Sequence, residues 1–252
     1  MADQTGKLGH EASDMTEEEF LRTYKAKDYP KPSVAVDLVI FTVVDAVLKV
    51  LLIKRKGHPH KGKWALPGGF VDVGNSYDEQ GESLEDAAHR ELSEETGLPM
   101  GSCFLEQLFT FGTPNRDPRM RIISVTYYAL ISADKMPLVK AGDDAEDARW
   151  FCVSHLVDEE LAFDHPHILR VAIDRIRGKI DYAPIAFELV PETFTVAELR
   201  AVYEAIKGST YDPSNFQRRF RRMQTDGIIE QAEGKRLSVV GPSARVYRFT
   251  RR

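Results

Sequence analysis

Three glutamates stand close together in the chain, at positions 91, 94 and 95. On an α-helix, the i, i+3 and i+4 spacing places their carboxylates on one face within a single turn. Like charges that close destabilise a helix unless a cation lies against them. Mg²⁺ suits this role because it takes oxygen ligands and is typically shared between carboxylates and substrate phosphates. Glu91, Glu94 and Glu95 are therefore candidate metal ligands, and the alternative is a solvated acidic helix.

The sequence around these glutamates predicts the helix that they need. Ser83 is a candidate N-cap, and Gly97 supplies a stop at the C-terminal end. The face away from the glutamates is small and apolar, which suits a helix packed on a sheet. That face consists of Leu84, Ala87, Ala88 and Leu92.

Strand patterns surround this helix and indicate an α/β fold. Two β-branched apolar runs, 34–44 and 47–54, are joined by Asp45-Ala46 and predict a hairpin. Further strands are expected at 103–112, 122–131 and 148–151, and a helix at 164–177 with Asp164 as its N-cap. Tyr127 and Tyr128 must point to opposite faces of their strand.

Three arginines gather just before the strand at 122–131, at positions 116, 119 and 121. Arginine forks match the geometry of phosphate. Arg116, Arg119 and Arg121 are therefore candidate ligand-binding residues, and surface salt bridges are the alternative.

Composition bounds the class of protein. A chain of 252 residues has room for one large domain or two smaller ones. It contains no apolar run of the roughly 18 residues that a membrane span needs, and no secretory signal pattern. Cys103 and Cys152 form neither a metal motif nor a disulfide framework, so we expect a cytoplasmic protein with no membrane partner.

Charge is distributed unevenly along the chain. The whole sequence has a formal net charge of −5, whereas residues 188–252 hold twelve Lys or Arg and eight Asp or Glu. The C-terminal part is therefore net positive and the remainder strongly negative. This asymmetry is typical of an enzyme-like part joined to a part that binds a polyanion.

The basic C-terminal part predicts a winged helix–turn–helix. Thr195 and Glu198 form a capping box for a helix to Lys207, and a second helix follows Asp212 to about residue 225. A hairpin is expected from 228 to 249, with Lys235 and Arg236 near its turn. An arginine-rich second helix is a candidate reader of a DNA groove. The candidate DNA-binding residues are Asn215, Arg218, Arg219, Arg221, Arg222, Lys235 and Arg236. The alternative is a basic dimerisation appendage.

The acidic helix also resembles a known motif. Glu82 followed by Arg90-Glu91-Leu92-x-Glu94-Glu95-x-Gly97-Leu98 resembles the Nudix box, and Trp64 to Phe70 resembles its lead-in. The resemblance implies a Nudix α/β/α sandwich with a mixed sheet, and hydrolysis of a nucleoside diphosphate derivative with Mg²⁺ (or Mn²⁺). It implies catalytic roles for Glu82, Arg90, Glu94 and Glu95, and ligand contacts at Gly68 and Gly69.

Related Nudix enzymes suggest a base from a later loop. Here Glu146, in the acidic segment 141–147, is the candidate, and a solvated acidic loop is the alternative. One departure concerns spacing: twelve residues separate Gly69 from Glu82, where the Nudix pattern has five. The extra residues, about Asn75 to Gly81, are expected to loop out beside the metal site.

The whole chain resembles the Nudix-related transcriptional regulators of NAD metabolism. The resemblance rests on Pro32–Asp37, Trp64–Phe70, Arg116–Arg119, Leu161–Leu169, Asn215–Arg219 and Pro242–Phe249. It implies a Nudix domain that senses ADP-ribose or a related nucleotide, and a winged helix that binds double-stranded operator DNA within a homodimer. We therefore expect a tail and short helix at 1–30, a Nudix domain at 31–185 and a winged helix at 186–252.

Two functional hypotheses remain open. The first is a nucleotide-sensing regulator that keeps a metal-dependent hydrolase activity. The second is an active pyrophosphatase, converting ADP-ribose to AMP and ribose 5-phosphate, whose C-terminal domain serves only dimerisation. The intact glutamates favour the second, while the arginine helix and the charge asymmetry favour the first.

Overall fold

The computed structural model describes residues 16–25, 30–74, 80–138, 145–156, 160–236 and 243–250. The chain divides into two compact units, residues 1–32 and 33–252. The first unit contains helix α1 (Glu17–Thr23), which begins at a capping box. The Thr16 hydroxyl accepts a bond from the Glu19 amide, and the Glu19 carboxylate accepts one from the Thr16 amide.

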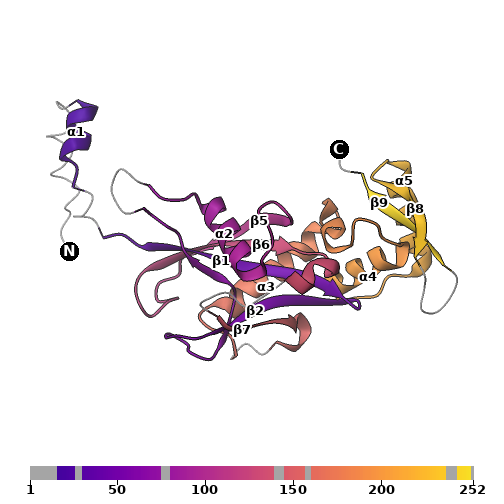
Figure 1. Ribbon diagram of the computed structural model, residues 1–252, viewed down its shortest axis with the longest axis horizontal. Helices are drawn as coiled ribbons and strands as arrows, with labels where there is room; N and C mark the ends of the chain where they lie inside the picture. The colour runs from indigo at the N-terminus through magenta and orange to yellow at the C-terminus, as the bar shows by residue number, and fades with distance from the viewer. Residues whose placement is uncertain are drawn as a thin grey trace. The chain divides into compact units, whose positions relative to one another are not determined.

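The second unit is built on a seven-stranded mixed sheet (Figure 1). Its strands are β1 (Ser33–Val44), β2 (Val47–Arg55), β3 (Trp64–Ala65), β4 (Gly68–Phe70), β5 (Phe104–Phe111), β6 (Ile122–Leu130) and β7 (Ala145–Cys152). The order is β3-β2-β1-β6-β5, with β4 paired to β1 and β7 paired to β2. Only the β1–β6 pairing is parallel among these described pairs, and the mixed α/β architecture predicted from the sequence is confirmed.

The hairpin between β1 and β2 turns where the sequence predicts. Asp45 and Ala46 have φ angles of 52° and 60°. Positive φ at both central residues is the requirement of a two-residue type I′ turn, which matches the twist of the flanking strands.

Two helices cover the two faces of the sheet. Alternate residues of β1 point to opposite faces, as the period of a strand requires. Leu38 and Ile40 pack with α2 (Leu84–Thr96), while Val39 and Phe41 pack with α3 (His165–Lys179). Tyr127 and Tyr128 likewise fall into the two separate clusters, as expected.

Helix α2 begins and ends as predicted. The Ser83 hydroxyl accepts a bond from the Asp86 amide at 3.1 Å, and Gly97 adopts the left-handed conformation with φ of 69°. Of the predicted apolar face, Ala87, Ala88 and Leu92 are buried, but Leu84 is 37% exposed. Leu84 is the first helical residue, so it lies at the edge of the sheet contact.

The C-terminal part has the predicted winged-helix order. It comprises a short 3₁₀ segment, η5 (Pro184–Leu189), then α4 (Val196–Lys207), α5 (Pro213–Thr225), β8 (Ile229–Arg236) and β9 (Ala244–Phe249). The Thr195–Glu198 capping box and the Asp212 N-cap are both formed. Earlier in the chain, the short 3₁₀ turn η2 (Ala133–Leu138) lies between β6 and β7, and η3 (Val153–His155) follows β7 ahead of α3.

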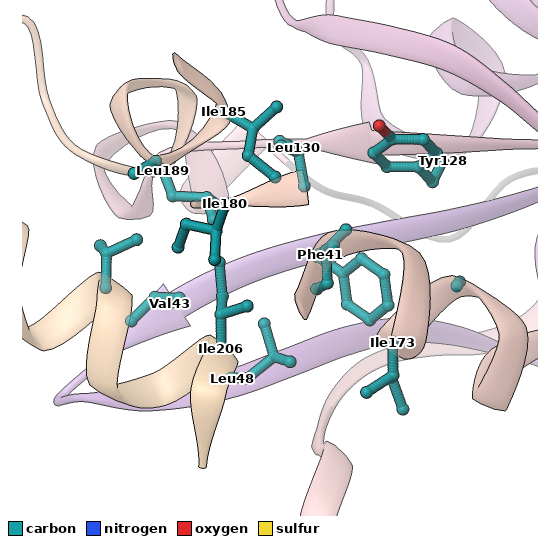
Figure 2. Packing of buried hydrophobic residues seen from close by; sticks show 14 of the residues in the cluster. Phe41, Val43, Leu48, Tyr128, Leu130, Ile173, Ile180, Ile185, Leu189 and Ile206 are labelled. Atoms are coloured by element: carbon teal, nitrogen blue, oxygen red, sulfur yellow. The ribbon is translucent and has the colours of Figure 1, made fainter. Parts of the chain in front are cut away.

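One hydrophobic cluster runs from the sheet into the winged helix (Figure 2). Figure 2 shows Ile206 of α4 beside Val43 and Leu48, which flank the β1–β2 turn. Ile180, just past α3, belongs to the same cluster. The sheet and the winged helix thus share a continuous apolar cluster, and the expected division at residue 185 falls inside η5. That division stays a prediction.

No described helix is both long and apolar enough to cross a membrane.

Candidate functional site

A cavity of about 1130 Å³ opens where β1, β4 and α2 meet. Pockets for small molecules and cofactors commonly measure about 300–1,000 Å³, so the space suits a ligand as large as a nucleoside diphosphate derivative. The Nudix-box residues that line it are Gly68, Gly69, Arg90, Glu91, Glu94, Glu95 and Gly97.

Arg90 holds two of the predicted glutamates together. Its Nη2 donates to Glu82 Oε1 at 2.7 Å and its Nε donates to Glu82 Oε2 at 3.1 Å. Its Nη1 donates to Glu91 Oε1 at 2.7 Å. The bond from Arg90 lowers the pKa of Glu82, whereas burial raises the pKa of Glu91. Arg90 therefore positions the carboxylates on one side of the cavity.

The two glycines of β4 are required by close contacts. A Cβ on Gly69 would stand 2.1 Å from Glu91 Oε1, and one on Gly68 would stand 2.2 Å from the Val36 carbonyl oxygen. Gly68 also has φ of 152°, which favours glycine. The glycines therefore allow two close approaches of β4, to β1 at Gly68 and to the Glu91 carboxylate at Gly69.

The base of the long loop before α2 is closed by a pair of bonds. The Asp72 amide donates to Glu82 Oε1 at 2.9 Å, and the Glu82 amide donates to the Asp72 carbonyl oxygen at 2.9 Å. Glu82 is therefore aligned with Arg90 despite the extra residues. Residues 75–79 of the predicted insertion lie outside the described residues.

The predicted metal ligands lie along one wall of the cavity. Glu91 and Glu95 are 7% and 6% exposed, and the Glu94 side chain is 55% exposed. In the described part of the chain, no three His, Cys, Asp or Glu side chains are gathered as a ready metal site, and Glu91 bonds Arg90 instead. A buried carboxylate whose pKa is raised is a group that a divalent cation would stabilise in its charged form. The donor set therefore fits a hard metal ion.

The three loop arginines have different surroundings. Arg116 is 5% exposed at its side chain and forms a fork with Asp164 at 2.9 and 2.7 Å. Arg119 pairs with Asp117 at 2.8 Å and lies over the Phe70 ring, half-exposed. Arg116 and Arg119 line the cavity, whereas Arg121 is exposed and does not.

The fork corrects the expected role of Asp164. This residue stands at the N-cap of α3, but its side chain makes no capping bond. Its carboxylate binds Arg116 instead, because a buried guanidinium requires a charged partner. The bond fixes the first turn of α3 to the cavity wall.

A buried polar cluster beneath the cavity escaped the sequence analysis. Asp37 accepts bonds from Ser124 Oγ at 2.5 Å and from Arg116 Nη2 at 3.3 Å. His165 Nδ1 accepts a bond from the Leu66 amide at 2.9 Å, and its Nε2 lies 3.8 Å from Asp37 Oδ1. Asp37 could have been found, because it is the one charged residue in an otherwise apolar strand.

Glu146, the candidate base, lies in β7, but its side chain falls outside the described residues.

Helix α5 presents part of its arginine set to solvent. Arg218, Arg221 and Arg222 are exposed, whereas Phe216 and Phe220 are buried on the opposite side. Asn215 accepts a bond from Arg218 at 2.7 Å. These exposed side chains form the surface that a groove reader needs.

Two other predicted DNA contacts are engaged within the protein. Arg219 donates to the Asp181 carboxylate at 3.4 Å, and its guanidinium lies 4.5 Å from the centre of the Tyr203 ring. Arg236 donates to Glu198 at 2.6 Å. Lys235 is exposed, and both Lys235 and Arg236 lie in β8 rather than in the turn.

Comparison with known proteins matches both parts of the chain. Residues 31–172 match the family described as NUDIX domain, and residues 186–249 match the NrtR DNA-binding winged helix domain. The chain is 37% identical to the "ADPR responsive transcriptional repressor NtrR" of Acinetobacter baylyi, over 93% of this chain and 88% of that protein. It is 41% identical to an ADP-ribose pyrophosphatase of Methanocaldococcus jannaschii, over 58% of this chain and 76% of that protein.

A solved structure is similar to most of the chain. The crystal structure of Shewanella oneidensis NrtR in complex with a 27mer DNA superposes with a TM-score of 0.70 at 31% identity. The match covers 86% of this chain and 93% of that chain. This chain belongs to the Nudix family, in the branch whose members carry an NrtR-type winged-helix domain.

Proposed function

We propose that this protein is a transcriptional regulator that binds ADP-ribose in its Nudix cavity and operator DNA through its winged helix. The observation that carries the proposal is the presence, within one compact unit, of a nucleotide-sized cavity and an exposed arginine helix. The names of the Acinetobacter and Shewanella relatives support both ligands. Such a regulator would act in the cytoplasm as a homodimer.

The cavity would also hold a divalent metal, Mg²⁺ or Mn²⁺. A bound metal would neutralise the diphosphate and activate a water molecule for hydrolysis. Glu91, Glu94 and Glu95 would supply the oxygen ligands. Arg90 would orient Glu91 and Glu94 through the bonds of its Nη1, and Glu82 would fix Arg90 through its two bonds. We therefore expect hydrolase activity to be retained.

The winged helix would contact DNA with the exposed part of α5. A cluster of arginines on one helix distributes itself between phosphates and base edges. Arg221 and Arg222, which are exposed, and Arg218 are the contacts that we favour. Arg219 and Arg236 would instead position the helix and the hairpin, because their guanidinium groups are held by Asp181 and Glu198.

Helix α3 supplies a physical route between the two ligands. At its start, Asp164 binds Arg116 of the cavity wall. Near its end, Arg177 donates to the Ile206 carbonyl oxygen of α4 at 3.1 Å, and Asp181 binds Lys207 and Arg219. ADP-ribose can change the affinity for DNA only if it binds more tightly to one of two conformations of the protein that differ along this route.

A gel-shift titration with the DNA upstream of the protein's own gene tests the regulator. We expect specific binding, and saturating ADP-ribose is expected to weaken it by about 1–3 kcal/mol, which is five- to 150-fold. Equal operator affinity with and without ADP-ribose would remove the regulatory part of the proposal. A protein that also failed to bind the DNA would instead be assigned to the alternative function, a pyrophosphatase whose winged helix serves only dimerisation.

The alternative is an ADP-ribose pyrophosphatase whose winged helix serves only dimerisation. The formed Glu82–Arg90–Glu91 arrangement favours it, as does the likeness to the Methanocaldococcus enzyme. Chromatography of products after incubation with ADP-ribose and Mg²⁺ tests the activity: AMP and ribose 5-phosphate are expected. Their absence after prolonged incubation with either metal would leave a sensor without hydrolysis.

A further inference from the structure

One stretch of the cavity wall lies outside the Nudix box. It contains Arg55, the last residue of β2, and Phe163, two residues before α3. The Arg55 guanidinium carbon lies 4.9 Å from the centre of the Phe163 ring. Its Nε donates to the Pro59 carbonyl oxygen at 2.9 Å. The Pro59 carbonyl oxygen therefore holds one edge of the guanidinium, and the Phe163 ring lies against one of its faces.

The charge of Arg55 is balanced differently from that of its neighbours. Arg90, Arg116 and Arg119 in the same cavity each bind a carboxylate, at 2.7, 2.7 and 2.8 Å. Among the described residues, no carboxylate forms an ion pair with Arg55. Burial and the charge of Arg119 lower its pKa. Arg55 thus presents to the cavity a cation that is held by a carbonyl oxygen and an aromatic ring, while Asp117 and Asp37 attract it without forming an ion pair.

Phe163 is held in an unusual backbone conformation. Its φ angle is 52°, which a bulky residue with a Cβ rarely adopts. The Ala162 amide bonds the Trp64 carbonyl oxygen at 2.8 Å just before it. The ring also contacts His60 and His165, with centroids 4.7 and 5.2 Å away. Such strained residues cluster where ligands are held. Arg55 and Phe163 both line the cavity.

We propose that Arg55, supported by Phe163, is the platform on which the purine base of the bound nucleotide stacks. This inference rests on the proposed function, because it assigns one end of the ADP-ribose molecule. A planar guanidinium stacks on π-systems, and nucleic-acid bases have π-faces that such a group can contact. The Nε–H, one of the five donors that could bind a phosphate, already binds the Pro59 carbonyl oxygen. A base would stack on the guanidinium face that turns away from the Phe163 ring.

The remaining parts of the ligand fit elsewhere. The diphosphate and its metal belong beside Gly68, Gly69 and the α2 glutamates, where the backbone approaches closely. A platform separate from those groups would select the base without contributing to phosphate binding. Purines offer a larger stacking face than pyrimidines, so the platform predicts a preference for ADP-ribose over UDP-ribose.

Calorimetric titration of the full chain with these two nucleotides tests the platform. Titrations would be run in EDTA and, separately, with Mg²⁺ over times shorter than any detected turnover. The wild type is expected to prefer ADP-ribose by about tenfold. Arg55→Lys keeps the charge but removes the plane, so it should lower ADP-ribose affinity about tenfold and UDP-ribose affinity less than about twofold.

Two further variants make the comparison specific. Phe163→Asn removes the ring while tolerating a left-handed backbone, and it should also abolish the base preference. Arg149→Lys changes an arginine that likewise lies over an aromatic ring, Trp64, but does not line the cavity, and the preference should survive. Thermal unfolding of each variant shows whether it is folded.

The outcomes separate this inference from the function on which it rests. If the wild type binds ADP-ribose but Arg55→Lys keeps the full base preference, or weakens both ligands equally, the platform is wrong and the regulator stands. If the folded wild type binds neither nucleotide under either condition, both proposals are wrong.

Discussion

At the scale of single residues, the cavity depends on contacts that leave no room for a methyl group. Gly69 approaches the Glu91 carboxylate so closely that an added Cβ would stand 2.1 Å from Oε1. The obstructing atom is the end of a flexible side chain, so it can move without unfolding the sheet. The position therefore affects the placement of Glu91 more than the stability of the fold.

Gly69→Ala is accordingly expected to displace Glu91 and to lower metal-dependent hydrolysis of ADP-ribose by about 10²-fold, the cost of a misplacement near 1 Å. Its melting temperature should change little. Gly57→Ala is the matched control, because Gly57 lines the same cavity but an added Cβ would meet nothing within 4 Å. Equal turnover in both variants would show that hydrolysis does not depend on the position of Glu91 beside Gly69.

His165 gives a prediction about pH. Burial lowers its pKa, so the folded protein holds it neutral, while the unfolded chain takes up a proton near pH 6.5. The unfolded state then binds more protons, and stability falls as pH drops below about 6.5.

His165→Asn retains an acceptor for the Leu66 amide but does not titrate. Between pH 7 and 5, the wild type should therefore lose stability more steeply than the variant, by at most about 1.4 kcal/mol per pH unit. Urea unfolding across this range measures the difference. If the free energy of unfolding depends on pH in the same way in both proteins, His165 is not a buried neutral imidazole.

The resemblance to the Nudix box implied roles for Glu82 and Arg90, but nothing in the sequence predicted the partners of the loop arginines. Glu82 and Arg90 are eight residues apart, and a helix with its preceding turn brings them together. Arg116, by contrast, binds Asp164 from 48 residues away and Asp37 from 79 residues away. At such separations, the carboxylate that pairs with an arginine depends on the register of the sheet and on where α3 begins against it. Neither can be predicted from local spacing.

At the scale of elements, the sequence was most informative where local chemistry decides. The ends of α1, α2, α4 and α5 follow from capping residues, and the β1–β2 turn follows from two residues that accept positive φ. The N-cap of α3 was predicted less well, because Asp164 is drawn to a buried arginine. A tertiary ion pair can therefore override a local capping preference.

Helix α5 divides its arginines between two tasks. Replacing Arg221 and Arg222 together by alanine should weaken DNA binding of any sequence and reduce the salt dependence by about one unit for each phosphate that the variant no longer neutralises. Filter binding at several salt concentrations measures both. Arg149→Ala, which removes an exposed arginine from β7, is the control and should leave affinity and slope unchanged. An unaltered salt slope in the double variant would exclude these arginines from phosphate binding.

At the scale of the whole molecule, α3 is one element that is fixed by polar contacts at both the cavity and the winged helix. Asp164→Asn would weaken the fork with Arg116 while leaving the helix in place. The proposed coupling of about 1–3 kcal/mol between ADP-ribose and operator DNA is expected to fall by at least half in this variant. The reason is that coupling through α3 requires the DNA-competent and DNA-incompetent states to differ at this contact.

Gel shifts with and without saturating ADP-ribose measure that coupling. Asp174→Asn is the matched control, since Asp174 lies on the same helix with its side chain 78% exposed. If both variants respond to ADP-ribose as the wild type does, the route through the start of α3 is wrong.

The contact of Ile206 with Val43 and Leu48 has a consequence for descent. A gene that gained a new DNA-reading segment by recombination near residue 185 would inherit the hairpin tip from one parent and α4 from the other. The two surfaces would then be mismatched at a buried position, where even one methylene group alters stability. Among relatives, we therefore expect side-chain volumes at 43, 48 and 206 to have changed together. The exposed arginines of α5 are expected to vary independently of them, with the sequence of the operator.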